Sequence, residues 1–324
     1  MDLRRQPTIT DVARLSGVST GTVSRVINQR PGVHPETKAR VLEVVEKLGY
    51  VPMQAARELT GHADTVGILL SPGTRRYIPY FIHLFERLNE ALWRDGLKLS
   101  ETPVDSVGLP LEAARGYVLL GAHDHDPRIE YLRDQGLPFV LVGVYPHTFC
   151  VSPDDENGSM EATRHLLELG HTELVHVTGD VSFQAGRERL QGFRRALEAK
   201  GLSYRPEQLL DGDFTSLGAY RAVYKYWSRG GRFTGAVAAS DEMAVGVMAA
   251  LEDLGVRVPA EVSVVGYDDL PEVGENLTTM RQDISEIART AVRLLKEAIS
   301  GSKPYGVRSP VRLVVRKTTS QIGR

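Results

Sequence analysis

The sequence predicts an α/β protein with a small all-α helix-turn-helix head, a hinge helix, and a two-lobed body built from doubly wound parallel sheets. Three observations support this prediction. The first fifty residues show only helical spacing of apolar side chains. From residue 65 onward, short apolar runs alternate with amphipathic stretches, as in βαβ units. The body spans about 260 residues, which is large for one doubly wound sheet and favours two lobes.

The head reads as three short helices separated by clear stop and start signals. Thr10 is an N-cap candidate for the first helix, and Gly17 interrupts that helix. Ser19 is the N-cap candidate for the second helix, Pro35 opens the third, and Gly49 ends it. Residues 51–63 form a connector whose middle is long enough for only one or two helical turns. Such a helix is too short to be stable alone.

The body alternates strand-like and helix-like segments. The predicted strands are 66–70, 116–120, 139–142, 174–177, 235–239 and 262–266. The predicted helices are 80–95, 127–136, 155–170, 185–200, 217–229, 242–255 and 283–300, and a last apolar segment covers 311–315. The segment 100–115 departs from this rhythm, because it is too short and too rich in proline and glycine for a crossover helix. We therefore expect a reduced N-terminal lobe.

Charge and composition restrict the class of protein. Residues 1–62 contain 9 Lys or Arg and 6 Asp or Glu, a net charge of +3, which leaves −5 for the rest of a chain whose total is −2. A basic head on an acidic body fits a nucleic-acid-binding module, although an ordinary solvated surface is an alternative. No apolar run reaches the ~20 residues of a membrane span, and no apolar signal follows the start. A single cysteine, Cys150, indicates a reduced, cytoplasmic protein.

Several runs of sequence together resemble the LacI-type family of bacterial transcription factors. The head carries TITDVARLSGVS at 8–19 and TVSRVIN at 22–28, followed by LGYVP at 48–52 and AAREL at 55–59. The body carries HLLELGH at 165–171, SDEMA at 240–244, VVGYDD at 264–269 and RKTTS at 316–320, in the family's order. The resemblance implies a DNA-binding head joined by a hinge to a periplasmic-binding-protein-like effector domain.

The resemblance implies that the second helix of the head reads DNA in the major groove. An arginine there can make a bidentate pair with guanine, and hydroxyls can contact phosphates. The predicted DNA-binding residues are Thr10, Ser19, Thr20, Gly21, Thr22, Ser24, Arg25, Asn28, Ala56 and Leu59. Leu59 resembles the hinge leucine that wedges into the minor groove. Met53 and Glu58 depart from the family's hinge, since Asn is usual at the first position and the second adds a negative charge near phosphates.

An effector cleft is expected between the lobes, lined by loops at the carboxyl ends of strands. Carboxylates can accept hydrogen bonds from sugar hydroxyls, arginine supplies several donors, and an aromatic ring can stack on a sugar. The predicted effector-binding residues are Tyr80, His123, Arg187, Arg189, Phe214, Ser240, Asp241 and Asp268. Each has a structural alternative, either as a core aromatic or as part of an ion pair. Ile78 and Gly143 replace an Asn and an Asp that are common in the family.

Two other patterns in the sequence are candidates for metal binding and for catalysis. The run HDHD at 123–126 has the composition of a metal cluster, but a third ligand cannot be placed, so a solvated loop or an effector contact is favoured. The run GVSTG at 17–21 matches a hydrolase nucleophile elbow, but that motif requires a preceding strand. No dinucleotide or phosphate-loop fingerprint follows a strand, so no cofactor is predicted.

The sequence therefore predicts a repressor rather than an enzyme: a homodimer that binds double-stranded palindromic operator DNA and responds to a mono- or disaccharide. The alternatives are purine-type co-repression, a periplasmic sugar-binding protein, and an α/β enzyme with a DNA-binding head. The predicted domains are 1–50 for the head, 51–63 for the hinge and 64–324 for the effector domain. Its N-lobe covers about 64–151 plus 283–308, and its C-lobe about 152–282 plus 309–324.

Overall fold

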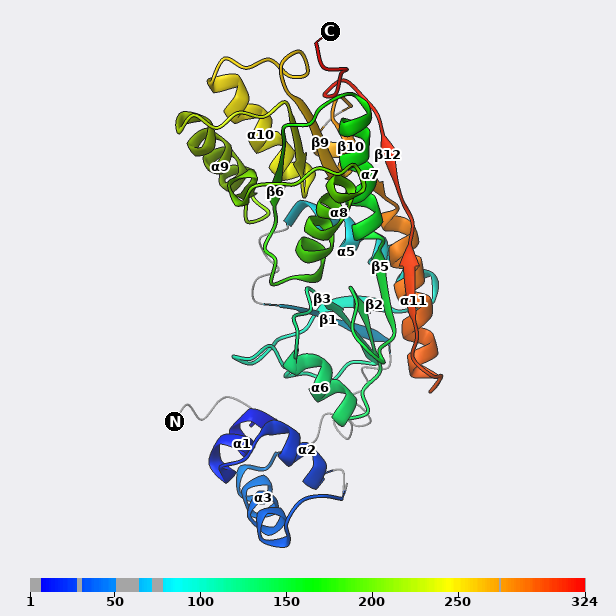
Figure 1. Ribbon diagram of the computed structural model, residues 1–324. Helices are drawn as coiled ribbons and strands as arrows, with labels where there is room; N and C mark the ends of the chain where they lie inside the picture. The colour runs from blue at the N-terminus through cyan, green and yellow to red at the C-terminus, as the bar shows by residue number, and fades with distance from the viewer. Residues whose placement is uncertain (1–6, 28–30, 51–63, 72–77, 274, 324) are drawn as a thin grey trace. The chain divides into compact units, whose positions relative to one another are not determined.

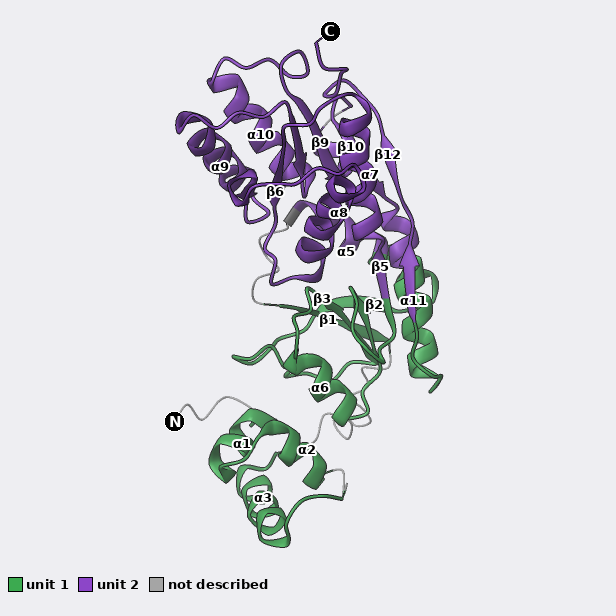
Figure 2. Ribbon diagram, viewed as in Figure 1, with its two compact units in different colours: residues 1–73, 88–150, 289–305 green, residues 74–87, 151–288, 306–324 purple. Residues whose placement is uncertain are grey.

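A computed structural model describes residues 7–27, 31–50, 64–71, 78–273 and 275–323. The hinge positions 51–63, with Ala56 and Leu59, and the head residue Asn28 lie outside the described residues. The chain divides into two compact units, coloured separately in Figure 2. Unit 1 comprises residues 1–73, 88–150 and 289–305, and unit 2 comprises 74–87, 151–288 and 306–324.

The head contains α1 (Ile9–Ser16), α2 (Thr20–Ile27) and α3 (Pro35–Leu48), as Figure 1 shows. Thr10 is not the cap of α1, which corrects the sequence-based prediction. Thr8 caps the helix instead, because its hydroxyl accepts from the amide of Asp11 while the Asp11 carboxylate accepts from the amide of Thr8. Gly17 and Gly49 end α1 and α3 in left-handed conformations, as the sequence predicts.

Unit 1 holds a six-stranded sheet in the order β11-β5-β4-β3-β1-β2. Its elements are β1 (Thr65–Leu70), α5 (Ile78–Arg94), β2 (Lys98–Glu101), β3 (Gly116–Leu120), α6 (Pro127–Asp134), β4 (Phe139–Val142), β5 (Cys150–Pro153), α11 (Ile284–Ile299) and β11 (Gly306–Ser309). α5, β5 and α11 each divide between the two units, and β11 belongs to unit 2. β1 pairs in parallel with both β2 and β3, and β3 with β4. Residues 102–115 contain no helix, so the expected loss of one crossover helix is confirmed.

Unit 2 holds a second six-stranded sheet, in the order β12-β10-β9-β8-β6-β7. Its elements are α7 (Asp155–Glu168), β6 (Leu174–Thr178), α8 (Gln184–Ala199), η2 (Pro206–Gln208), β7 (Leu209–Asp211), α9 (Ser216–Ser228), β8 (Gly235–Ala238), α10 (Asp241–Asp253), β9 (Ser263–Asp268), η3 (Pro271–Val273), β10 (Thr278–Gln282) and β12 (Val311–Val314). Five strands lie parallel, and β12 closes one edge antiparallel to β10. The predicted alternation and the two parallel-sheet lobes are confirmed.

Each sheet buries an apolar core between its helices. β3 and β6 are buried along their whole length, as expected for central strands of a parallel sheet covered on both faces. Because all parallel strands of a sheet point the same way, their carboxyl ends share one edge. In unit 2, β8 and β9 end at Ala238 and Asp268, so the residues that follow or end these strands gather at that edge.

Candidate functional site

The second helix of the head presents one polar face. Val23 and Val26 are buried in the head, whereas Arg25 is exposed and Thr20 is half-buried. The Ser19 hydroxyl accepts a hydrogen bond from the Thr22 amide at 3.1 Å, which confirms Ser19 as the cap of α2. An exposed arginine on a short, capped helix is suited to reading a base edge.

The remaining predicted DNA residues of the head occupy different environments. Gly21 and Thr22 are half-buried near the start of α2. Thr10 lies in the first turn of α1, and its hydroxyl donates to Asp105 at 2.5 Å. Ser24 is buried and accepts a hydrogen bond from the side-chain amide of Gln135 at 2.7 Å. In this conformation Thr10 and Ser24 are therefore engaged by the lobe of unit 1.

The centre of the unit 2 site is the guanidinium of Arg189, a buried residue of α8. Its Nε donates to Asp155 at 2.8 Å, and its Nη1 donates to the carbonyl of Ala239 at 2.6 Å and lies 3.4 Å from the Asp268 carboxylate. The guanidinium also lies 3.8 Å from the ring centroid of Tyr267, a cation–π contact. Arg189 is thus held by four partners in an orientation that leaves little rotational freedom.

Asp268 carries the strongest sign of a functional position. It ends β9 with φ of 119°, a backbone conformation that is unfavourable for a residue with a side chain. Gln282, at the end of β10, donates to the same carboxylate at 2.5 Å. Burial raises the pKa of Asp268 to about 8, with further raising by Asp241 and Asp155, although Arg189 opposes these effects.

The other two carboxylates at this edge are also buried. Burial raises the pKa of Asp241 to about 6, although the hydrogen bond from Thr279 opposes this rise. Burial also raises the pKa of Asp155, although the charge of Arg189 opposes that rise. Conversely, Asp155 and Asp268 raise the pKa of Arg189 against the effect of its burial. Two carboxyl groups, those of Asp155 and Asp268, share one guanidinium, so the site has a surplus of hydrogen-bond acceptors. Ligands that bring hydroxyl donors match that surplus.

Two further predicted residues belong to the structural frame of this edge. Ser240 caps α10 by accepting from the Met243 amide at 3.1 Å. Asp241 accepts from the Thr279 hydroxyl at 2.5 Å and from the amide of Leu270 at 2.8 Å, so both its oxygens are used within the protein. The contacts of Asp241 tie the start of α10 to the start of β10 and to the loop that follows β9. This supports a framing role for both residues.

The aromatic and basic candidates are spread around the same unit. Burial raises the pKa of Tyr80, and the charges of Asp268 and Asp155 add to this, which places its phenol within their field. Phe214 is buried with φ of 51°, and its ring packs so closely on Gly179 that a Cβ there would overlap it. Arg187 donates to the carbonyls of Val181 and Ser182, at 3.2 and 2.6 Å, in the loop that precedes α8.

Unit 1 contains a smaller polar cluster at the carboxyl ends of β1 and β3. Ser71 Oγ lies 2.5 Å from His123 Nε2. Beneath them, Arg128 is fully buried and paired with Asp126, with Nη2 2.6 Å from the carboxylate. Arg128 Nη1 also donates to the carbonyls of Leu69 at 2.9 Å and Leu120 at 3.1 Å. The arginine therefore fixes the two strand ends that carry Ser71 and His123.

The alternative chemistries find no support at these positions. Among the described residues, no group of three His, Cys, Asp or Glu side chains is arranged to hold a metal. The run GVSTG at 17–21 joins two helices, α1 and α2, so the strand that a nucleophile elbow needs does not precede it. No helix in the described part of the chain is both long and apolar enough to cross a bilayer.

Sequence reasoning missed two residues that contact the predicted ligand carboxylate and arginine. Asp155 is the first residue of α7 and lies next to Asp154 and Glu156, a run that is typical of a helix N-terminus. Gln282 ends a strand whose pattern, Thr-Thr-Met-Arg-Gln, was too polar to predict. The position of Asp155 two residues after a buried strand, β5, is the available signal.

Comparisons with known proteins agree with this division into head and body. Residues 8–53 match the family described as "Bacterial regulatory proteins, lacI family", and residues 163–319 match "Periplasmic binding protein-like domain". The HTH-type transcriptional regulator CelR of Thermobifida fusca is 34% identical over 336 aligned positions, covering 97% of each chain. The HTH-type transcriptional repressor PurR of Aliivibrio salmonicida is 31% identical and covers 90% of this chain and 92% of its own.

Solved structures show the same likeness. A transcriptional regulator CelR–cellobiose complex superposes with a TM-score of 0.75 at 32% identity, covering 96% of this chain and 99% of its own. The lac repressor dimer bound to operator and the anti-inducer ONPF superposes with a TM-score of 0.66 at 26% identity, covering 98% of this chain and all of its own.

Proposed function

This chain belongs to the LacI family of bacterial transcriptional regulators, and from that premise we propose that its effector is a sugar held by Arg189 and Asp268. The family consists of regulators rather than enzymes, and the protein is a DNA-binding repressor controlled by a small molecule. The proposal therefore concerns the class of effector, the residues that hold it and the assembly that binds DNA.

The observation that carries the sugar proposal is the surplus of acceptors around Arg189. Asp155 and Asp268 both face this one guanidinium, and Gln282 adds an amide to the second carboxylate. Adjacent hydroxyls of a sugar can donate to a carboxylate and accept from a guanidinium at the same time. The relative with a cellobiose-bound structure supports a disaccharide as the first candidate. Tyr80, Arg187 and Phe214 complete the proposed effector set of unit 2, which Ser240 and Asp241 frame. His123 of unit 1 is kept as a separate proposed effector contact.

A purine is the second candidate, because PurR repressors are also among the relatives. Phe214 offers an aromatic face for either kind of ring. A purine base has no vicinal hydroxyls to offer the carboxylates of Asp155 and Asp268, so the acceptor surplus favours the sugar. The sign of the response, induction or co-repression, depends on whether the ligand binds the DNA-bound or the DNA-free state more tightly.

DNA binding is proposed to involve Arg25, Thr20 and Gly21 at base edges. We assign contacts with the DNA phosphates to the polar side chains of Thr10, Ser19, Thr22, Ser24 and Asn28. We assign contacts with the minor groove to the hinge residues Ala56 and Leu59. The proposed domains keep the predicted boundaries of 1–50, 51–63 and 64–324. DNA is the target, so the proposed location is the cytoplasm.

A homodimer is proposed to present two heads to a palindromic operator. One observation on α5 supports a second copy as its partner. The side chain of Trp93 is 76% exposed, and that of Ile82 is 47% exposed, in a helix whose Leu84, Leu88 and Leu92 are buried. A helix that buries one face and exposes a tryptophan on another is suited to packing against a second chain.

Direct titration calorimetry tests the effector proposal. Cellobiose, a panel of mono- and disaccharides, and guanine and hypoxanthine are titrated into wild type, Asp268→Asn and the exposed control Glu207→Gln. We expect one sugar to bind wild type and the control equally, and to bind Asp268→Asn at least 30-fold more weakly. Binding of a purine with no sugar binding, or sugar binding unaffected by Asp268→Asn, would overturn the proposal.

A further inference from the structure

One face of the sheet in unit 1 lacks the helix that should cover it. The connections β2 to β3 and β3 to β4 cross the sheet in the same direction, so the right-handed crossover rule places both on one face. α6 is the second of these connections, and residues 102–115 replace the first without a helix. The apolar side chains of Leu69, Tyr117 and Leu119 lie on this face.

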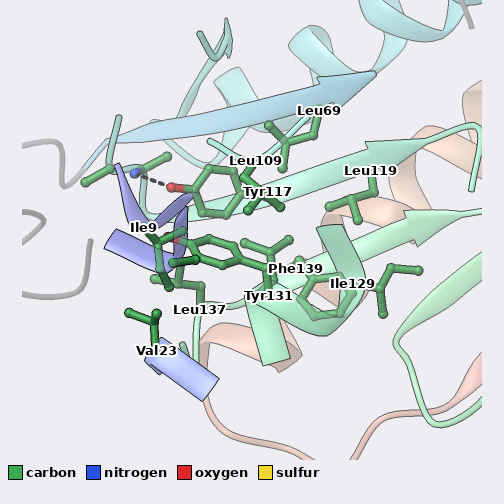
Figure 3. Close-up of a cluster of buried hydrophobic side chains, with 14 of the residues drawn as sticks. Ile9, Val23, Leu69, Leu109, Tyr117, Leu119, Ile129, Tyr131, Leu137 and Phe139 are labelled. Carbon is green, nitrogen blue, oxygen red and sulfur yellow. Dashed lines mark hydrogen bonds between the residues drawn. The ribbon is translucent and has the colours of Figure 1, made fainter. Parts of the chain in front are cut away.

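The loop covers only part of the face. Leu109, Ala113 and Ala114 are buried against it, and the Tyr117 hydroxyl fixes the loop by donating to the carbonyl of Glu112 at 2.9 Å and accepting from the amide of Ala114 at 3.1 Å. The same apolar cluster then continues into the DNA-binding head. Figure 3 shows Ile9 from α1 and Val23 from α2 beside Tyr131 and Leu137 of the lobe.

Polar contacts join the head to this surface at three points. Thr10 donates to Asp105, which is itself held by the amides of Val107 and Leu109 in the short loop. Gln135, at the end of α6, donates to Ser24, and both side chains are at least 98% buried. The third contact is a hydrogen bond between the hydroxyl of Tyr50, in the head, and that of Tyr131, in α6 of the lobe. Buried, directional contacts of this kind specify one docked orientation.

We propose that this face, lined by Asp105, Leu109, Tyr131 and Gln135, is a docking surface for the chain's own DNA-binding head, and that docking competes with operator binding. The competition rests on the proposed DNA-contacting residues. Thr10 and Ser24 are bonded to the lobe, and the Asp134 carboxylate lies 3.6 Å from the position of a Cβ on Gly21. A base edge cannot occupy the same place as that carboxylate. The docked head therefore cannot place Thr10, Gly21 and Ser24 against DNA, while Arg25 stays exposed.

Docking of this kind sets the operator affinity by mass action. If most heads are docked, the apparent dissociation constant rises by the reciprocal of the free fraction. A change on the lobe that weakens docking must then tighten operator binding, although it touches no DNA. An increase in affinity on removing a contact is unusual, and it distinguishes competition from simple structural support.

The test uses the full-length protein and a duplex that wild type selects from a random-sequence pool. Gln135→Ala removes the bond to Ser24, and Glu130→Ala, an exposed residue of the same helix, is the matched control. We expect Gln135→Ala to bind the duplex at least threefold more tightly than wild type and Glu130→Ala to bind it equally. Equal or weaker binding by Gln135→Ala, with an unchanged melting temperature, overturns the proposal.

Hydrogen exchange gives a readout that does not depend on which head residues read DNA. In wild type, amides of residues 103–114 and of α6 are expected to exchange faster when the selected duplex is added, because the head leaves the surface. Protection that persists on the DNA means that something other than the head covers this face, and it contradicts the proposal. Loss of duplex binding in Arg25→Ala is a separate test of the DNA assignment.

Discussion

The guanidinium of Arg189 lies 3.4 Å from the carboxylate of Asp268 while its Nε donates to Asp155 at 2.8 Å. All three side chains are buried. One cation between two carboxylates is an arrangement that stabilises neither carboxylate fully, which explains why burial raises the pKa of both. An effector can therefore donate hydrogen bonds to the carboxylates of Asp155 and Asp268, which the protein satisfies only in part.

Substitution of Arg189 is expected to damage the fold as well as the binding of effector. Arg189→Ala leaves Asp155 and Asp268 buried together without their cation, and breaking a buried ion pair in this way costs about 3–5 kcal/mol. Urea denaturation of Arg189→Ala should show this loss, whereas Asp268→Asn should lose less than half as much. Equal stability of Arg189→Ala and wild type would show that the pair is not formed in solution.

The pKa of Asp268, raised to about 8, makes effector affinity depend on pH. Sugar hydroxyls donate to the ionised carboxylate, and below pH 8 the empty site binds a proton that the sugar must displace. Affinity for the bound sugar is therefore expected to rise about tenfold or more from pH 6 to pH 9, measured by calorimetry. Asp268→Asn should show a flat profile, and a wild-type affinity that falls over this range would contradict the assignment.

Gly179 tests the position of Phe214. An alanine Cβ at this position would overlap the Phe214 ring, which therefore has to move. Gly179→Ala is expected to weaken sugar binding at least tenfold while the selected duplex is bound as by wild type. Gly201→Ala controls for general destabilisation, because its φ of 69° strains the backbone of the same unit while the added Cβ meets nothing within 4 Å. Unchanged sugar affinity in Gly179→Ala would remove Phe214 from the effector set.

Arg128 is expected to stabilise the lobe of unit 1 through the ends of β1 and β3. Arg128→Leu leaves Asp126 buried and unpaired and frees the carbonyls of Leu69 and Leu120, a loss of about 3–5 kcal/mol. The double variant Arg128→Leu with Asp126→Asn should recover part of this loss, because no charge is then buried alone. Denaturant midpoints measure both, and a double variant less stable than the single would refute the pairing.

Arg25 is expected to supply base discrimination. Arg25→Ala should weaken binding to the selected duplex by about 1–3 kcal/mol and reduce the preference over random DNA. Arg14→Ala is the control, because Arg14 is an exposed arginine of the head that pairs with Asp11. Fluorescence anisotropy at fixed salt measures both. Equal losses in the two variants would indicate a general charge effect in place of readout by Arg25.

Local sequence patterns predicted most of the framework. The buried central strands β3 and β4 were predicted with their observed bounds, because continuous apolar runs between turns have few other readings. Strands at or near sheet edges, such as β7 and β10, were missed because β7 is only three residues long and β10 is mostly polar. The predicted cap of α1, Thr10, is wrong by two residues, because the capping box between Thr8 and Asp11 starts the helix earlier.

The site was only partly predictable from sequence, for a different reason. Arg189 and Asp268 were found by resemblance, but their partners depend on contacts between distant segments. Asp155 lies 34 residues from Arg189, and Gln282 reaches Asp268 from the neighbouring strand. The contact of Gln135 with Ser24 spans 111 residues, and no local pattern indicates it. Such pairings become visible only when the tertiary structure is known.

The most direct test of the account is release of operator by the effector. The selected duplex is titrated with wild type and with Asp268→Asn, each in the presence and absence of the sugar that binds wild type. We predict that the sugar weakens duplex binding by wild type at least tenfold and leaves Asp268→Asn unaffected. If the sugar binds the wild-type protein but leaves the protein's affinity for the duplex unchanged, the sugar does not control DNA binding and the central claim is wrong.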